Sequence, residues 1–275
     1  MDESADLIEL KSHFAFGKNW ESYAKLVNDS QVEQAIAGLQ RLLGGDLRGK
    51  RFVDVGCGSG VHSLAALRLG ATEVVALDID PASVATTRHL LEKHAAGEHW
   101  STHEMSVFDL EPDGLGPYDV VYSWGVLHHT GNLHRALRAA GALVAPGGQF
   151  IFALYYRTPL CRFWKLEKRW YSAASPVAQA RARSIYVGLH RMLYPLKYSG
   201  SFNDFIANYS KRRGMDYYHD VHDWLGGWPY ESISAAETEQ LMQQLGLRRI
   251  RAFGRKRKTV GLFGVGCNEY VYGRE

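Results

Sequence analysis

The sequence predicts an α/β protein with a mostly parallel sheet covered by helices on both faces. Short β-rich runs alternate with helical patterns between residues 51 and 154, which is typical of a parallel sheet. A glycine-rich turn separates the first of these runs from the helical pattern that follows it. The alternation stops after residue 154 and resumes near residue 235, so the 275-residue chain is best explained as one domain with an insertion.

The elements of the first half follow from spacing and from residues that end helices. Apolar residues from 19 to 43 lie at mostly helical spacings, and Gly44 and Gly45 end the pattern. Residues 51–55 form a β-rich run, and the apolar positions of residues 64–69 belong to a helix that Gly70 ends. A second strand is expected at 74–78, with Pro81 in the first turn of the next helix.

The later elements repeat this order. Strands are expected near 102–105, at 118–122 and at 149–154, and near 247–253 and 264–272; helices are expected across 132–144 and near 235–245, with a turn at 146–148. The chain therefore divides into an N-terminal helical segment (1–50), an α/β core (51–154 and 231–275) and an inserted helical cap (155–230).

The composition indicates an ordinary folded protein. Hydrophobic residues make up 46% of the chain and charged residues 22%, which excludes disordered, collagen-like and coiled-coil classes. The three cysteines fit no metal-ligand spacing, the first residues do not resemble a signal peptide, and no run approaches the ~20 apolar residues of a membrane helix. We therefore expect a cytoplasmic protein without a membrane partner and without a metal.

The strongest local signal is the sequence VDVGCGSG at residues 53–60, which lies directly between a predicted strand and a predicted helix. Glycines at such a turn allow a ligand to approach the backbone, and the helix N-terminus offers unpaired N–H groups. The spacing is GxGxG rather than the GxGxxG of dinucleotide-binding proteins. Glycine turns also occur where tight packing alone requires them. The prediction of a ligand site at this turn therefore depends largely on the acidic residues nearby.

Two acidic residues suggest the kind of ligand. Asp54, two residues before the first glycine, disfavours a pyrophosphate at the turn and favours a cationic group. Asp78 ends the second strand, where a carboxylate can accept hydrogen bonds from both ribose hydroxyls. Its alternative role is that of an ordinary strand-end turn residue. Together the two residues favour a nucleoside that carries a cation, as S-adenosylmethionine does, over NAD.

Four motifs, in order and spacing, resemble those of class I S-adenosylmethionine-dependent methyltransferases. They are DVGCGSG at 54–60, LDIDP at 77–81, SVFD at 106–109 and YDVVYSWGVLHHT at 118–130. The resemblance implies a Rossmann-like sheet of seven strands in the order 3-2-1-4-5-7-6, with the last strand antiparallel. Further motifs, FGKNW at 16–20, DWLGGWPYE at 223–231 and GCNEY at 266–270, resemble those of a subgroup with no single defining reaction.

The resemblance also implies a cofactor site for S-adenosylmethionine, whose product is S-adenosylhomocysteine. Asp54 would face the amino group, the turn of Gly56, Cys57, Gly58 and Gly60 would shape the methionine pocket, and Asp78 would hold the ribose. Ile79 would pack on the adenine, and Asp109 with the backbone near Val107 and Phe108 would read its edge. Ser123 and Trp124 would border the methionine end of the cofactor and the acceptor. The aromatic Tyr156 departs from the small polar residue expected after the fifth strand.

Candidate catalytic residues follow the fourth strand and the insertion. His128 and His129 lie where a parallel sheet binds ligands, so either imidazole could serve as a general base. A purely structural role in the turn that follows is equally compatible for each histidine. Glu231 or Asp223 could accept hydrogen bonds from an amine or hydroxyl acceptor.

The insertion is rich in aromatic residues, with ten of the fifteen tyrosines and four of the seven tryptophans between residues 155 and 230. Most of these rings would form its own core. Around them we assign acceptor binding to Tyr155, Tyr156, Asp220, Asp223, Trp228 and Tyr230. Metal binding by His219, His222, Asp220 and Asp223, or a structural role for Trp228 and Asp223, are the alternatives.

The total charge of +3 hides a strong asymmetry. Residues 155–213 carry twelve Lys or Arg and two acids, and residues 248–258 carry seven basic residues and no acid, so the remainder carries about −14. A basic cap above the cofactor suggests an anionic acceptor as a hypothesis. A solvated surface, or pairing of the cap with the acidic core, is the alternative.

The sequence therefore predicts an enzyme that transfers a methyl group to O, N or S of a small, anionic metabolite. Two alternatives remain: a methyltransferase for RNA or nucleotides that uses the basic segments, and a cofactor-binding regulator without catalysis. Steep salt dependence of activity would favour RNA, although no RNA-binding module is recognisable. The oligomeric state is left open.

Overall fold

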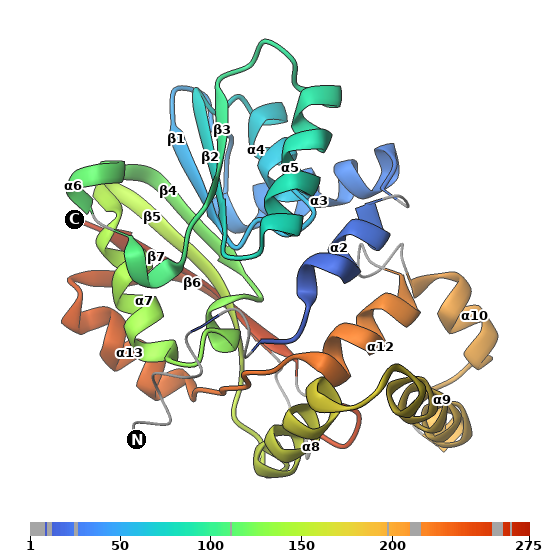
Figure 1. Ribbon diagram of the computed structural model, residues 1–275. Helices are drawn as coiled ribbons and strands as arrows, with labels where there is room; N and C mark the ends of the chain where they lie inside the picture. The colour runs from blue at the N-terminus through green and yellow to red at the C-terminus, as the bar shows by residue number, and fades with distance from the viewer. Residues whose placement is uncertain are drawn as a thin grey trace.

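A computed structural model describes Glu9 and residues 13–24, 27–110, 112–196, 198–209, 216–254, 261–264 and 266–275. Its centre is a seven-stranded sheet in the order β3-β2-β1-β4-β5-β7-β6, in which β7 runs antiparallel to both neighbours (Figure 1). The strands are β1 (Arg51–Val55), β2 (Glu73–Asp78), β3 (Trp100–Glu104), β4 (Tyr118–Trp124), β5 (Val144–Tyr155), β6 (Leu247–Phe253) and β7 (Cys267–Arg274). The predicted strand order is confirmed.

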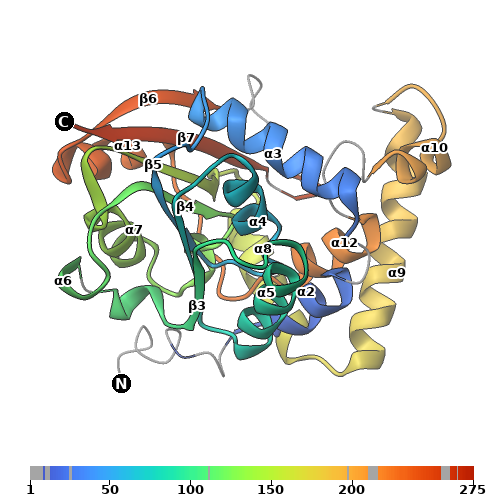
Figure 2. The same ribbon diagram turned by 90° about the horizontal axis from the view of Figure 1, so that it is seen from above.

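One face of the sheet is covered by α3 (Asp29–Leu43), α4 (Val61–Arg68) and α5 (Pro81–His94). Their apolar sides pack on Phe52, Val120 and Ile151 of the strands. Figure 2 shows α3 lying along α4 and passing over the sheet towards β7. The helical segment that precedes β1 therefore belongs to the core, because burying its apolar side completes this layer.

The opposite face is covered by α7 (Leu133–Ala142) and α13 (Ala235–Gln244). Their buried residues pack against Val55, Leu77 and Phe152, which alternate along the strands with the residues of the first face. The short helices η2 (Val107–Asp109) and α6 (Pro112–Leu115) connect β3 to β4, and η3 (Leu127–His129) connects β4 to α7. The predicted two-sided covering is confirmed.

Two elements differ in detail from the prediction. The N-terminal pattern is divided into α2 (Phe16–Ala24) and α3, because Asn28 caps α3 in a capping box with Gln31. The turn expected at 146–148 lies inside β5, which pairs with β4 on both sides of a register shift between Tyr118 and Val120. The glycines at 147–148 therefore form an irregularity of a longer strand rather than its boundary.

Helices also fill the stretch between β5 and α13. They are α8 (Cys161–Ala173), α9 (Pro176–Leu193), η4 (Tyr194–Leu196), α10 (Phe202–Ala207) and α12 (Tyr217–Gly226). We call them the cap helices. They share an aromatic cluster that includes Tyr171, Tyr217 and Trp224, and Phe14 from the N-terminal segment joins it. Among the described residues, no helix has both the length and the apolar character needed to cross a membrane.

Candidate active site

The glycine turn joins the end of β1 to the start of α4. Gly56, Gly58 and Gly60 all have left-handed φ angles, of 82°, 53° and 78°. A Cβ atom on Gly56 would lie 2.4 Å from a methyl group of Val126, and one on Gly60 would lie 2.9 Å from Cα of Thr87. The turn therefore needs glycine both for its backbone angles and for close packing.

The turn is tied to the end of β2. The backbone N–H groups of Gly56 and Cys57 donate to the carbonyl of Leu77, at 2.8 and 2.9 Å. Asp78 accepts from the N–H of Gly58 at 3.0 Å and from that of Asp80 at 2.9 Å. Burial raises the pKa of Asp78 to about 6. Its carboxylate is therefore ionised at neutral pH and keeps lone pairs free for further hydrogen bonds.

A pocket lies at this edge of the sheet. Five of the predicted cofactor residues line it, namely Gly56, Asp78, Ile79, Val107 and Phe108. His13, Met105, Val126 and Thr130 also line it. One carboxylate among mainly apolar walls suits a ligand with a polar sugar and a flat apolar ring.

Other predicted cofactor residues lie beside this pocket or behind it. Asp54 is buried on the α4 side, where it accepts a hydrogen bond from Ser63 Oγ at 2.6 Å, and burial raises its pKa to about 7. Ser123 Oγ donates to the carbonyl of Val55, and Trp124 Nε1 donates to Glu269. Cys57, Gly58, Gly60 and Asp109 also fall outside the described lining of the pocket.

The N-terminal segment covers the glycine turn, which the sequence had not indicated. The indole of Trp20 packs on Gly58, and the N–H of Gly17 donates to Asp80 Oδ2 at 2.9 Å. Asn19 Nδ2 donates to Asp223 Oδ1 of α12 at 2.5 Å. The motif at 16–20 thus connects the turn, the start of α5 and the cap helices; its adjacent glycine and aromatic residues were the available signal.

His128 and His129 are buried where the sheet meets the cap helices. The centroids of their rings lie 4.3 Å apart, and the ring of His128 also packs against that of Tyr155 at 3.9 Å, with the two planes tilted by 41°. His129 Nδ1 donates to the carbonyl of Pro229 at 2.7 Å. Burial lowers the pKa of His128 well below its usual range and that of His129 to about 3. Both imidazoles are therefore neutral, and His129 fastens the DWLGGWPYE segment to the core.

Lys168 is the most unusual side chain at this junction, and the sequence analysis did not single it out. It is fully buried in α8, and its Nζ has no hydrogen-bond partner among the described residues. The ammonium group lies 3.6 Å from the ring centre of Trp224 and 5.4 Å from that of Tyr230. Burial lowers its pKa to about 7. A lysine within an aromatic run was the only available signal.

Three of the predicted acceptor residues lie near Lys168, and Tyr156 and Trp228 belong to the same aromatic cluster. Tyr155 packs on both Trp224 and Tyr230, at 5.4 and 5.5 Å between centroids. Asp223 is half-buried; its removal from water raises its pKa to about 8, and the hydrogen bond from Asn19 and the charge of the nearby Lys168 oppose this shift. The structure therefore brings Tyr155, Asp223 and Tyr230 together around an amine.

The remaining predicted acceptor and catalytic residues have structural contacts. Asp220 accepts from the hydroxyl of Tyr209, and the carbonyl of Trp228 accepts from the N–H of Phe14. Glu231 accepts from the N–H of Leu133 at the start of α7. Such contacts satisfy a helix end and fix two loops.

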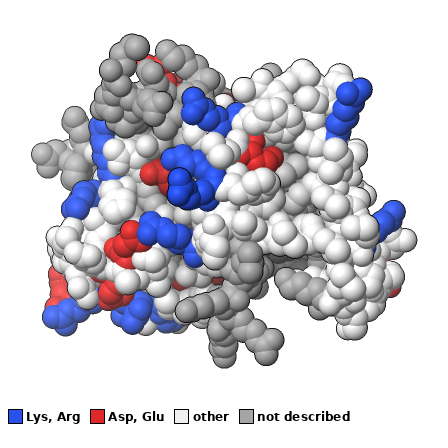
Figure 3. All heavy atoms as spheres, turned by 90° about the horizontal axis from the view of Figure 1, so that it is seen from below, with Lys and Arg blue, Asp and Glu red and all other residues white. Residues whose placement is uncertain are grey.

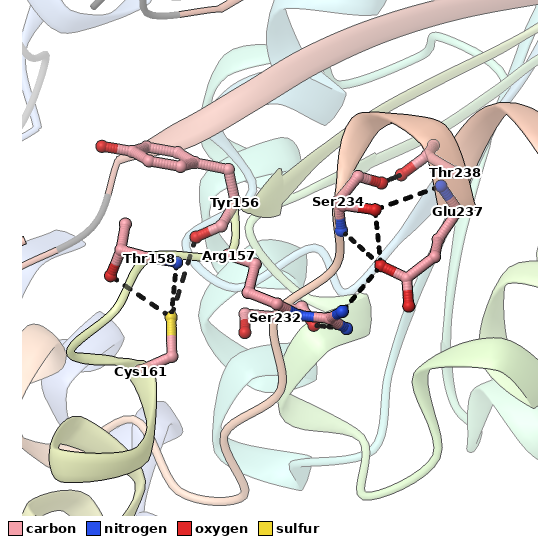
Figure 4. Close-up of polar contacts among 8 residues, drawn as sticks. All are labelled: Tyr156, Arg157, Thr158, Cys161, Ser232, Ser234, Glu237 and Thr238. Atoms are coloured by element: carbon pink, nitrogen blue, oxygen red, sulfur yellow. Dashed lines mark hydrogen bonds and ion pairs between the residues drawn. The ribbon is translucent and has the colours of Figure 1, made fainter. Parts of the chain in front are cut away.

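Tyr156 lies where the chain leaves the core for the cap helices. It pairs with Ile233, so the outgoing and returning segments run side by side. Arg157 bridges them, because its guanidinium donates to the carbonyl of Ser232 and pairs with Glu237 at 2.9 Å (Figure 4). This connection holds the cap helices to the core. Among the described residues, no group of three His, Cys, Asp or Glu side chains could hold a metal ion.

The strand order defines a class I, Rossmann-like domain, and the pocket lies at the carboxyl edge of its sheet. A family model described as a methyltransferase domain matches residues 28–251, so the chain belongs to the S-adenosylmethionine-dependent methyltransferase family. S-Adenosylmethionine is the cofactor of this family.

Individual relatives are similar over part of their length. Ubiquinone biosynthesis O-methyltransferases from Bordetella avium and Xanthomonas oryzae are each 36% identical over 42% of this chain. The matches span about half of those proteins, 47% and 46%.

Solved structures share the fold at low identity. Magnesium protoporphyrin IX methyltransferase from Synechocystis, with bound S-adenosylhomocysteine, has a TM-score of 0.52 at 16% identity, with 89% of this chain and 82% of that chain covered. The [4+2]-cyclase SpnF has the same score at 12% identity, with 88% and 80% covered. The fold alone therefore does not determine the reaction.

Gly17 offers a test of the N-terminal contact. A Cβ atom at this position would lie 2.3 Å from the carboxylate of Asp80. We expect Gly17→Ala to lower the free energy of unfolding by about 1–3 kcal/mol, measured by chemical denaturation. Gly38→Ala is the control, because nothing lies within 4 Å of its Cβ position. Equal behaviour of the two variants would contradict the contact.

The lowered pKa of His129 predicts that the folded protein loses stability in acid. Below its ordinary pKa of 6.5 the unfolded chain binds a proton that the folded chain, with a pKa of about 3, does not. Stability is therefore lost as the pH falls from 6.5 towards 3, by about 1.4 kcal/mol per pH unit. His128 contributes a slope of the same sign, so in His129→Asn, which keeps a donor, the slope of denaturation free energy against pH should become smaller by about the contribution of one histidine. His134→Asn, an exposed control, should retain the full slope.

Proposed function

We propose that this protein transfers a methyl group from S-adenosylmethionine to an oxygen of a small acceptor held beneath the cap helices. The observation that carries the proposal is the glycine turn held by Asp78 at a mainly apolar pocket. Family membership supports methyl transfer, and the O-methyltransferase names of the relatives support oxygen as the acceptor atom.

The described residues fit the cofactor. Asp78 would accept from the ribose hydroxyls, while Ile79 and Phe108 would enclose the adenine. The positive φ angle of Gly56 lets the backbone come close to the ligand. Trp20 and His13 would cover the site from the N-terminal side and exclude water. When bound, S-adenosylmethionine supplies a methyl group that its sulfonium charge already activates.

The acceptor would lie near the buried amine of Lys168. Tyr155, Trp224 and Tyr230 form flat apolar walls around Nζ, and such walls suit a ring or another flat group. With its pKa lowered to about 7, Lys168 can donate a hydrogen bond to an acceptor oxygen or take a proton from a hydroxyl group. The neutral His128 and His129 would position the neighbouring Tyr155 and the loop at Pro229.

Support for an anionic acceptor is weaker than the charge pattern suggested. Arg162, Lys165 and Arg181 of the cap helices are exposed rather than directed into the aromatic cluster. Arg183 does reach the cluster, but there it donates to the hydroxyl of Tyr171 at 2.7 Å. Lys211, Arg212, Arg213 and residues 255–258 lie outside the described residues. We therefore do not assign a charge to the acceptor, and no observation favours RNA.

Cofactor binding can be tested at Asp78. Asp78→Ala should weaken the binding of S-adenosylhomocysteine by about 1.5–3 kcal/mol in titration calorimetry, because it removes a buried charged acceptor. Asp78→Asn, which keeps one oxygen, should lose less. The wild type incubated with S-adenosylmethionine and a metabolite extract should yield a product one methyl group heavier. No affinity for either form of the cofactor would refute the proposal.

Lys168→Met separates acceptor chemistry from stability. Replacing an unpartnered buried ammonium with an apolar side chain should leave the free energy of unfolding within about 1 kcal/mol or raise it. The yield of the methylated product should fall at least about tenfold, which corresponds to one lost charged hydrogen bond. S-Adenosylhomocysteine affinity should not change. Full product yield in this variant would remove Lys168 from the acceptor site.

A further inference from the structure

Exposed apolar residues are concentrated on the outer side of the cap helices. Of the thirteen large hydrophobic residues exposed among the described residues, nine lie between residues 163 and 198. On α8 they are Phe163, Leu166 and Trp170; on α9 and just beyond they are Val177, Ile185, Leu189, Met192, Leu196 and Tyr198. Monomeric soluble proteins rarely expose so many such residues close together.

The two helices have different reasons for this exposure. In α8, Trp164, Lys168 and Tyr171 face inwards and are buried, while Leu166 is 70% exposed on another side. In α9, an 18-residue helix, no described residue is buried, and Met192 is 63% exposed. The two helices contact each other, and Figure 1 shows both at the same lower edge of the molecule, away from the sheet. We call this surface the α8–α9 face.

The charged residues of this face are almost all basic. Arg162, Lys165, Arg169, Arg181 and Arg191 are exposed, and the only acidic residue within α8 and α9 is the half-buried Glu167. Figure 3 shows a broad uncharged surface on the side where these helices lie, with isolated basic groups towards its margin. Exposed Trp, Phe and Leu together with Lys and Arg are typical of helices that lie in a membrane interface.

The positive charge of the α8–α9 face distinguishes between two partners, a second copy of the chain and an anionic bilayer. A second copy of the chain, docked through the same face, would bring two sets of basic residues together with almost no acid to pair them. An anionic bilayer supplies the opposite charge for the arginines and an apolar layer for the side chains of Leu166, Ile185 and Met192. Trp170 suits the boundary between the two, where aromatic residues are enriched.

We propose that the α8–α9 face is a docking surface for an anionic lipid bilayer. The helices would lie in the interface and would not cross it. The expectation of no membrane partner rested on the absence of a long apolar run, and such an absence speaks only against spanning. The inner side of α8 carries Lys168, so the candidate acceptor site would lie directly behind the docked surface.

Vesicle sedimentation with the full chain tests the proposal. The wild type should sediment with vesicles of phosphatidylcholine mixed with phosphatidylglycerol, and much less with phosphatidylcholine alone. Added salt should reduce the binding, because exposed charges are screened. Absence of binding to the anionic vesicles at low salt would overturn the proposal.

Two sets of variants and a control localise the binding. Arg162→Gln, Lys165→Gln and Arg181→Gln together should weaken binding to anionic vesicles by about 100-fold, at about five-fold per charge. Leu166→Ser, Ile185→Ser and Met192→Ser together should also abolish most of it. Ile250→Ser with Leu262→Ser is the control, because both residues are exposed but lie outside this face.

Three results would count against the docking surface. Equal loss in the control would mean that binding depends on general surface apolarity. Unchanged binding in both sets of variants would place any lipid contact elsewhere. A wild-type dimer in light scattering that the Leu166, Ile185 and Met192 substitutions dissociate would assign the face to a second copy. Thermal unfolding of each variant should match the wild type, which confirms that a loss of binding is not a loss of fold.

Discussion

The hydrogen bond from the N–H of Gly58 to the carboxylate of Asp78 holds the site together. It joins the turn after β1 to the end of β2, two strands that pair in parallel and therefore end at the same edge. Asp78 also accepts from the N–H of Asp80, and Asp80 in turn accepts from Gly17. A chain of three carboxylate contacts thus positions the glycine turn, the start of α5 and the N-terminal segment relative to one pocket.

The second organising feature is the interface between the core and the cap helices. The side chains of Lys168, His128 and His129 are buried there, and that of Asp223 is half-buried. Removal from water shifts the pKa of each group in the direction that favours its neutral form. Burying such groups destabilises the fold relative to an interface made of apolar side chains. Such destabilising groups occur mainly where they have a chemical role. The interface between the core and the cap helices is therefore a better candidate for acceptor binding than the exposed basic residues.

The alternation of strand and helix patterns and the spacing of the motifs were sufficient to predict most of the core. They predicted the strands and the glycine turn, and the resemblance to the methyltransferases added Ile79, Val107 and Phe108, which line the pocket. Asp54 shows the limit. It alternates with Val53 and Val55 along β1, so it shares a face with Phe52 and packs against α4, while Val55 lines the pocket. The importance of Lys168 depended on tertiary packing, which the sequence pattern of α8 does not record.

The two sides of α8 explain why the cap was difficult to interpret from its sequence. A helix with apolar residues on one side usually packs that side on the protein core. In α8, aromatic residues are buried on one side and exposed on the other. Composition alone cannot distinguish a ring in a core from a ring on a surface, so all of them were expected to form the insertion's core or line a pocket. A helix is about 10 Å across. Leu166 is exposed and Lys168 is buried on the same helix, so a partner that contacted Leu166 from outside would be separated from the amine of Lys168 by little more than one helix.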